Sequence, residues 1–395
     1  GVCMTPLKLL GLLLLLLVLP VGHAVHNPCL AYSRELHIPG VAMHFKRFAP
    51  TKHVFKIFDA FIFNDEWEML EIRLHELAAH VDRFFMFEAD VSYSGNYKGY
   101  NARNVTAKFE RFAHKIEYHA IKMPGNLLKN AGTPASMAKD MRMRHANMKR
   151  EGHIRSVVQK RLLSLIPHND VVMYNDIDEL PNITLLQSLR VCDLVYHDKK
   201  TGQHLTFGTD RLGIMHQPVH LNVNFHCKSK DNPWPYGSLL FPNFLIRKVE
   251  VWIVRQWIDT PAGFGSMLRL PGRGWHFSSI AFTLDRIRNK YTCITEVVNN
   301  PALRARRRWS TQKWSEELEK MQRTGKGISL DLRCDEFFFR SLPNFIWNNA
   351  ETKFKHLLSP EQLVYAQSLL NRSDLHPNEI HYPGKFPTPR SPKIK

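Results

Sequence analysis

Long hydrophobic runs, cysteine and acidic residues are all scarce in this chain of 395 residues. One long apolar run lies at residues 9–22, and it is shorter than the roughly 20 residues that a membrane-spanning helix needs. Six cysteines in a chain of this length exclude a small scaffold held together by disulfides. The sequence shows no internal repeat, which excludes solenoids and propellers.

The shortage of acidic residues gives the chain a strong positive charge. Lys and Arg number 54 against 36 Asp and Glu, a formal net charge of +18. Such a surplus favours anionic partners: nucleic acid, membrane headgroups or a phosphorylated small molecule. Hydrophobic residues make up 44% of the chain, so it can bury a substantial core and is not a disordered protein.

The N-terminal segment narrows this choice. We interpret residues 1–24 as a signal peptide or signal anchor, because the apolar run fits a signal h-region and small residues stand at Gly22 and Ala24. We favour cleavage after Ala24. Either form leads into the secretory pathway, to the Golgi lumen or membrane or to secretion. Nucleic acid is then excluded as a partner, and a membrane is a partner only if the segment stays uncleaved.

The remaining chain divides into three parts. We expect an irregular stem at 25–53, a catalytic domain at 54–373 and a basic, proline-rich tail at 374–395. Past Ala24 five cysteines remain, which an oxidising lumen allows to form two disulfides with one left over; buried thiols are the alternative.

The pattern at the start of the catalytic domain predicts a parallel sheet. A strand-like run precedes a helix whose apolar residues recur every three or four positions from Trp67 to Val81, and a second strand-like run follows. Strand, helix and strand in this order form a βαβ unit. A basic helix at 136–166 followed by a strand at 171–174 repeats this helix-to-strand order.

The second strand-like step ends in a cluster of carboxylates. The stretch VVMYNDIDELP at 171–181 places Asp176 and Asp178 where an α/β sheet binds its ligands. Two carboxylates that converge there repel each other unless a hard divalent cation such as Mn²⁺ or Mg²⁺ neutralises them. A solvated acidic turn is the alternative. Asn182 begins a glycosylation triplet beside this tip, and we expect it to stay unmodified.

Several blocks of the sequence resemble glycosyltransferase family 17, the bisecting β-1,4-N-acetylglucosaminyltransferases. They are FDAFIFNDEWEMLEIRLHELAAHVDRFFMFEADVSYSG at 58–95, DVVMYNDIDELP at 170–181, Gly274-Trp275-His276, and the weaker GISLDLRC at 327–334. The resemblance implies a GT-A-type α/β fold, with a Rossmann-like half on a mixed, mainly parallel sheet and a second half that binds the acceptor. It also implies a Mn²⁺-dependent, inverting transfer from UDP-GlcNAc to an N-glycan.

The resemblance also suggests roles for individual residues. Asp178 would bind the metal, and Asp176 would contact the metal or the ribose. His276 is a further metal ligand or a packed histidine. Asn64, Asp65, Glu66 and Glu88 are candidates to bind the nucleotide; for the first three, helix capping is the alternative.

Two roles stay open in the sequence. Arg73 would bind a phosphate or form a salt bridge with Glu76 or Glu88. The catalytic base would be Glu179, Asp331 or Asp335.

Two other functions compete with sugar transfer. One is a secreted metal-dependent phosphohydrolase, which would need further His and Asp clusters around two metals. The other is a non-catalytic, basic glycan-binding protein.

Overall fold

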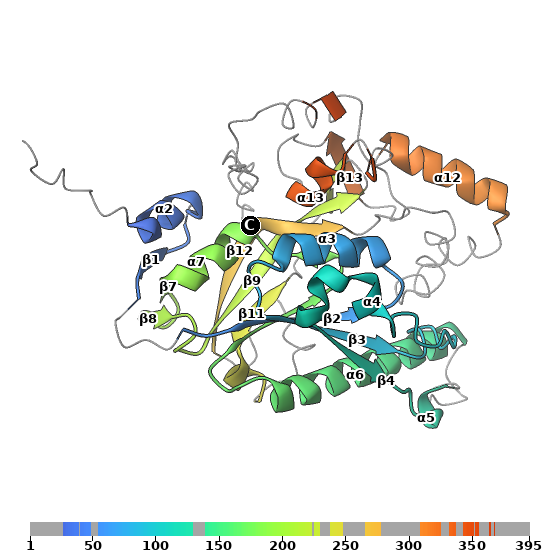
Figure 1. Cartoon of the computed structure of the whole chain (residues 1–395), viewed down its shortest axis with the longest axis horizontal. Coiled ribbons are helices and arrows are strands. Elements are labelled where there is room, and N and C mark those ends of the chain that lie inside the picture. Colours follow the sequence, from blue (N-terminus) through green and yellow to red (C-terminus); the bar gives the residue numbers. More distant parts are fainter. Residues whose placement is uncertain are drawn as a thin grey trace, which may run out of the picture.

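The computed structural model describes residues 27–38, 40–48, 54–128, 139–222, 225–229, 238–247, 265–277, 309–324, 332–336, 343–350 and 352–354, with Leu363, Val364 and Gln367. They form an α/β fold on a ten-stranded mixed sheet, with a smaller three-stranded sheet beside it (Figure 1). The predicted fold class is therefore confirmed.

Four parallel strands form the Rossmann-like half. Their order in space is β5–β2–β3–β4, and each neighbouring pair is parallel. The chain adds β3 and β4 on one side of β2 and then returns to place β5 on the other side. In such a sheet ligands bind at the carboxyl ends of the strands where the order reverses, here between β2 and β5. The strands are β2 (Ile57–Phe63), β3 (Arg83–Ala89), β4 (Ile116–Ile121) and β5 (Val171–Asp176).

Helices cover both faces of these strands, as the nearly continuous burial of β2 and β5 requires. Figure 1 shows α3 (Trp67–Leu77) and α6 (Lys139–Leu165) on opposite sides of the sheet. Because successive strand side chains alternate between the faces, Phe61 of β2 joins the core under α3 while Phe58 joins the core under α6. The helix α7 (Ile183–Val191) follows the acidic stretch and packs in the same core as α3.

The second half of the sheet is largely antiparallel. The strand β11 pairs with β5 and with β9, and β9 leads on to β10 and β13. One long strand, β12, runs parallel to β9 and ends antiparallel to the short β6. The bounds are β6 (Glu179–Leu180), β9 (Leu212–Asn222), β10 (Phe225–Ser229), β11 (Leu239–Pro242), β12 (Ser266–Phe277) and β13 (Leu332–Glu336).

The remaining described helices are short apart from one. They are α4 (Val105–Lys108), η1 (Glu110–Lys115), α5 (Gly125–Leu128), η3 (Asn243–Leu245) and the longer α12 (Thr311–Thr324).

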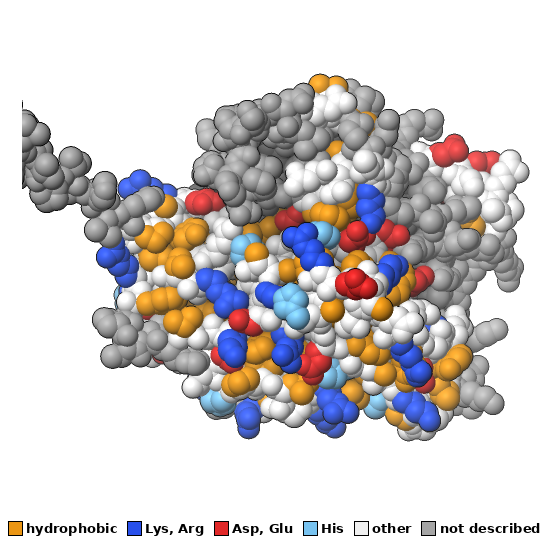
Figure 2. All heavy atoms as spheres, viewed as in Figure 1, with side chains coloured by type: hydrophobic (Ala, Val, Ile, Leu, Met, Phe, Trp, Pro, Cys, Tyr) orange, Lys and Arg blue, Asp and Glu red, His pale blue; other side chains and the backbone are white. Residues whose placement is uncertain are grey.

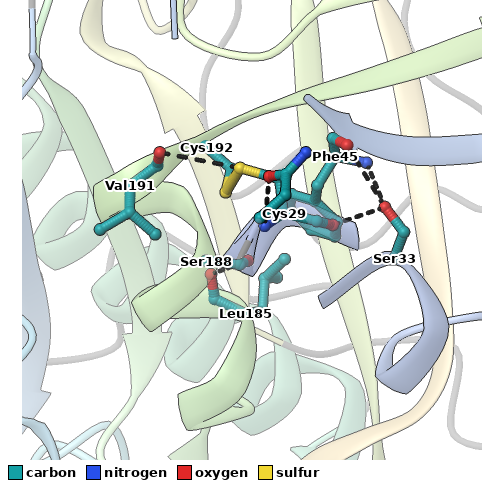
Figure 3. Close-up of a disulfide and its surroundings, with 8 residues drawn as sticks. Cys29, Ser33, Phe45, Leu185, Ser188, Val191 and Cys192 are labelled. Atoms are coloured by element: carbon teal, nitrogen blue, oxygen red, sulfur yellow. Dashed lines mark hydrogen bonds between the residues drawn. A yellow bond between two sulfur atoms is a disulfide. The ribbon is translucent and has the colours of Figure 1, made fainter. Parts of the chain in front are cut away.

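The expected irregular stem is wrong over the part of 25–53 that the structure describes. This segment forms α2 (Pro28–Glu35) and β1 (Met43–Arg47), and β1 pairs with β7 (Cys192–Asp198), which in turn pairs with β8 (Gln203–Thr206). A disulfide joins Cys29 of α2 to Cys192 at the start of β7 (Figure 3). The sequence separation is 163 residues, and closing so long a loop typically adds about 2–4 kcal/mol of stability. The ordered domain therefore starts well before Val54.

Some predictions lie beyond or only partly within the described residues. Residues 1–24 and 374–395 are outside them, as is Cys293. Cys227 and Cys334 are Cα partners on the antiparallel strands β10 and β13. Within the described part of the chain, no helix is both long and apolar enough to cross a bilayer.

Part of the positive charge is used inside the molecule. Figure 2 shows Lys and Arg side chains dispersed over one face, among apolar and acidic ones. In contrast, Arg73, Arg150 and Arg155 are buried. Arg150 of α6 donates to the carbonyl oxygens of Leu127 and Tyr93 at 2.7 and 3.1 Å, so it connects α6 to α5 and to the loop after β3.

The segment around α13 (Asn344–Asn348) packs on the outer side of α3. The His75 ring stacks on Phe345, with 3.9 Å between the centroids. The buried Glu76 carboxylate accepts a hydrogen bond from the Phe345 backbone N–H. Burial raises the pKa of Glu76 to about 7, and the Phe345 hydrogen bond opposes this only in part.

This pKa predicts a pH-dependent stability. Between its ordinary pKa of 4.5 and about 7, folded Glu76 keeps a proton that the unfolded chain has released, so the free energy of unfolding falls as pH rises through this window. Replacement of Glu76 with Gln should remove this loss. We expect Glu76→Gln to match the wild type at pH 4.5 and to be more stable by about 1–3 kcal/mol at pH 8 in urea titrations. A stability difference that does not change with pH would contradict this reading.

Candidate active site

The acidic stretch lies at the reversal point of the parallel sheet. Asp176 ends β5, and its Cα partner on the neighbouring strand is Ile62, close to the end of β2. The loop from Asp176 to Glu179 and the residues after Phe63 thus leave the sheet side by side at its carboxyl edge. This is the position that the sequence predicts for the site.

The buried side chain of Arg73 fixes the backbone of the acidic loop from the core side. Its guanidinium forms a two-pronged salt bridge with Asp59 of β2, in which Nε and Nη2 donate at 2.7 and 2.6 Å. The third nitrogen, Nη1, donates to three backbone carbonyl oxygens of the loop, at 3.4, 3.2 and 2.8 Å from Asp176, Ile177 and Glu179. Both charged side chains are fully buried.

The predicted role of Arg73 is therefore corrected. It lies fully buried under the loop, so it is not placed to bind a substrate phosphate, and its salt-bridge partner is Asp59 rather than Glu76 or Glu88. Burial raises the pKa of Asp59, while the charge and hydrogen bonds of Arg73 act in the opposite direction. An Arg with a planar fork suits this position because it can bind a carboxylate and a row of carbonyl groups at once.

The loop also closes on itself. The Glu179 carboxylate accepts a hydrogen bond from the Asp176 N–H at 3.1 Å, and the residue is buried. A general base must reach the proton that it removes. The Glu179 carboxylate turns back onto its own loop, and its role as the catalytic base stays a prediction.

A strand from the second half of the sheet reaches the acidic loop. In β12, Trp275 and His276 are Cα partners of Leu180 and Glu179, and the Phe277 N–H donates to the Asp178 carbonyl oxygen at 2.8 Å. His276 Nε2 lies 3.7 Å from Asp178 Oδ2. The two side chains are 10% and 15% exposed, so they form a secluded pair at the sheet edge.

Gly274 permits this approach. Its φ of +90° lies in the left-handed region, and a Cβ atom at this position would be 2.3 Å from the Leu180 carbonyl oxygen. Any larger residue would push β12 away from β6. The glycine of the Gly-Trp-His block is therefore needed to bring His276 to Asp178.

The two aspartates of the loop have different surroundings. Asp178 faces His276, whereas Asp176 Oδ1 accepts a hydrogen bond from Arg155 of α6 at 3.1 Å and its side chain is 38% exposed. Among the described residues no three His, Cys, Asp or Glu side chains converge as a metal site. The predicted three-ligand set is thus divided: Asp178 and His276 lie together, and Asp176 pairs with Arg155.

The residues that follow β2 lie at the same edge. Asn64, Asp65 and Glu66 are half-buried, and the Glu66 carboxylate accepts from the N–H groups of the other two at 3.1 and 3.0 Å. Glu66 precedes the first turn of α3 and makes no side-chain capping bond to that helix. These residues are beside the loop, and their contact with a nucleotide stays a prediction.

Glu88 has a structural role. Its buried carboxylate accepts from Lys98 Nζ, the Tyr118 hydroxyl and the N–H groups of Asn101 and Ala102, at 2.7, 2.8, 2.8 and 3.0 Å. With these donors it fixes the loop after β3, so the predicted contact with the nucleotide is not supported by its environment.

The other two predicted bases are Asp331 and Asp335. Asp335 lies on β13, at one edge of the ten-stranded sheet, and Asp331 is outside the described residues. Their catalytic role stays a prediction.

The glycosylation triplet beside the loop is inaccessible. The Asn182 side chain is buried, and its Oδ1 accepts from the Leu185 N–H at 3.1 Å, which caps α7. This supports the expectation that Asn182 stays unmodified in the folded chain.

Two important residues were missing from the sequence prediction. Asp59 is a charge within an apolar strand, and that pattern alone signals a buried ionic partner. Arg155 stands one helical turn after Glu151, and the two form a salt bridge at 3.0 Å. Nothing in the sequence indicates that Arg155 also reaches Asp176.

The Arg73 clamp leads to a testable prediction. Arg73→Met would leave Asp59 buried without its counter-charge, and we expect the free energy of unfolding to fall by about 3–5 kcal/mol. Asp59→Asn in the same protein should restore part of the loss, as measured in urea titrations. Arg83→Met is the matched control, because its salt bridge with Glu117 is exposed and should contribute about 1 kcal/mol or less. Equal losses for the Arg73 and Arg83 variants would refute the clamp.

Comparison with known proteins agrees with this geometry. The family model of glycosyltransferase family 17 matches residues 37–201, which span the parallel strands, α3 and the acidic loop. His276 lies beyond the matched residues. A comparison with curated proteins gives no significant match.

The match starts before Val54, which agrees with the ordered N-terminal segment, and it confirms the resemblance read from the sequence blocks at 58–95 and 170–181. Residues 37–201 are therefore similar to glycosyltransferase family 17, and this similarity supports a glycosyltransferase activity.

Proposed function

We propose that this protein transfers N-acetylglucosamine from UDP-GlcNAc, with inversion, to a mannose of an N-linked glycan in β-1,4 linkage. The family match supports sugar transfer in general. The observation that carries the proposal is the Asp178–His276 pair at the reversal point of the sheet, where α/β folds bind nucleotides. The donor sugar, the linkage and the acceptor follow from the resemblance alone.

The donor set at this edge fits a divalent cation that is shared with a substrate. Asp178 Oδ2 and His276 Nε2 are 3.7 Å apart, a separation that two ligands of one ion can adopt. Ions such as Mg²⁺ and Mn²⁺ are commonly held by one or two protein side chains together with phosphate oxygens and water. When bound, such an ion would act as a Lewis acid on the leaving diphosphate.

The nucleotide would lie across the ends of β2 and β5. Asn64, Asp65 and Glu66 present polar groups on the β2 side, and Asp176 does so on the β5 side. The N-terminus of α3 begins at the same edge, where backbone dipoles favour negative charge. Arg73 keeps the loop in place during binding.

The reaction joins an acceptor hydroxyl oxygen to C1 of the sugar while the bond from C1 to the diphosphate breaks. The hydroxyl proton must pass to a base. Glu179, Asp331 and Asp335 stay the candidate bases.

The secretory pathway, most simply the Golgi lumen, is the proposed location. The apolar run at 9–22 and the Cys29–Cys192 disulfide both support an oxidising compartment. An uncleaved run would anchor the protein in the membrane.

The function is tested by binding and by transfer. We expect UDP and Mn²⁺ together to raise the melting temperature of the wild type. UDP alone or Mn²⁺ alone should give a smaller rise. Asp178→Asn and His276→Ala should each remove this shift. Asp178→Asn should lower sugar transfer at least about 100-fold, since even outer-shell partners of a metal are worth 10–100-fold.

Glu110→Gln, an exposed change away from the loop, is the control. Full transfer activity in the Asp178→Asn protein, with the wild-type requirement for Mn²⁺, would overturn the proposal.

A further inference from the structure

Arg155 links α6 to the acidic loop, and each of its three nitrogens has a partner. Nε donates to Glu151 Oε1 at 3.0 Å, Nη1 to the Tyr174 hydroxyl at 3.3 Å and Nη2 to Asp176 Oδ1 at 3.1 Å. Arg155 is buried, while the Asp176 side chain remains more than one-third exposed at the sheet edge. One oxygen of Asp176 is thus fixed from inside the molecule, and the side chain still reaches the surface of the site.

The charges around the two aspartates differ accordingly. Asp176 faces the guanidinium of Arg155. Burial lowers the pKa of Arg155, but the negative charge of Asp176 raises it, and the net shift is upward. Asp178 faces the imidazole of His276, with Nε2 3.7 Å from Asp178 Oδ2. A divalent cation bound to Asp176 would meet the positive charge of Arg155, whereas one bound to Asp178 would not. An uncharged hydroxyl group has no such conflict with Arg155.

We propose that Arg155 is a positioning residue that reserves Asp176 for hydroxyl groups of the nucleotide sugar and leaves the cation to Asp178 and His276. This inference rests on the proposed function. Arg155 acts through Asp176: it fixes the rotamer of the carboxylate and places a positive charge beside it. Loss of Arg155 should therefore weaken nucleotide binding without weakening metal binding.

A purely structural Arg155 would behave differently. If Arg155 only connected α6 to β5, its replacement would loosen the whole loop, and Asp176 and Asp178 would both be displaced. Nucleotide and metal affinity would then fall in parallel. The ratio of the two affinities separates the two roles.

The experiment compares five full-length proteins: wild type, Arg155→Met, Asp176→Asn, the double variant Arg155→Met/Asp176→Asn, and Lys160→Met. Lys160 is an exposed cation on the same helix, so it controls for the lost charge. UDP is titrated calorimetrically at saturating Mn²⁺. Free Mn²⁺ is measured by electron paramagnetic resonance at saturating UDP.

We expect Arg155→Met to lower the affinity for UDP about 10-fold, because the loss of one charge-assisted contact typically has an effect of this size. Its Mn²⁺ affinity should be equal to or tighter than that of the wild type. Asp176→Asn should show the same split, and the double variant should be no weaker than Asp176→Asn alone, because Arg155 acts through Asp176. Lys160→Met should match the wild type.

Two results would overturn the inference. One is an equal loss of UDP and Mn²⁺ affinity in Arg155→Met, and the other is unchanged UDP affinity in that variant. If Arg155→Met does not fold, Arg155→Lys serves instead, because it keeps the charge but cannot span three partners, and the same split is expected. A wild type that fails to bind UDP with Mn²⁺ would refute the proposed function itself, which keeps the two failures distinct.

Discussion

The site depends on one buried cation, the guanidinium of Arg73. It cancels the charge of Asp59 inside β2 and holds the carbonyl groups of the acidic loop in a row. The loop therefore leaves β5 in one defined path, although it carries three acidic side chains close together. A buried ion pair of this kind adds little net stability compared with apolar packing, but removal of one partner is costly. Its use here is the fixed geometry of Asp176 and Asp178.

Because the acidic loop is fixed, the strand β6 that follows it can pair with β12 of the second half of the sheet. β12 can approach β6 only because Gly274 has no side chain, and this approach places His276 beside Asp178. The parallel half thus supplies a carboxylate and the other half supplies an imidazole. Neither half contains this pair alone, so closure of the sheet around β6 and assembly of the candidate site are one event.

The sequence predicted those features whose signals are local. The 3.6-residue period of α3 and the apolar runs of β2, β3 and β5 were sufficient for the parallel half, and the family blocks led to His276. The errors share one cause, since each depends on a partner far away in the chain. β1 pairs with β7 across the fold and carries a disulfide, so the stem looked irregular on its own. Arg73 and Glu88 look like free charges until Asp59 and the loop after β3 fold against them.

The position of the bound metal ion distinguishes Asp178 from Asp176 as its ligand. A crystal of the protein soaked with Mn²⁺ and UDP would show the ion by anomalous scattering. We expect one peak about 2.0–2.3 Å from both an Asp178 carboxylate oxygen and His276 Nε2, with the diphosphate on its open side. A peak bound by Asp176 instead, or one remote from the β2–β5 edge, would contradict this expectation.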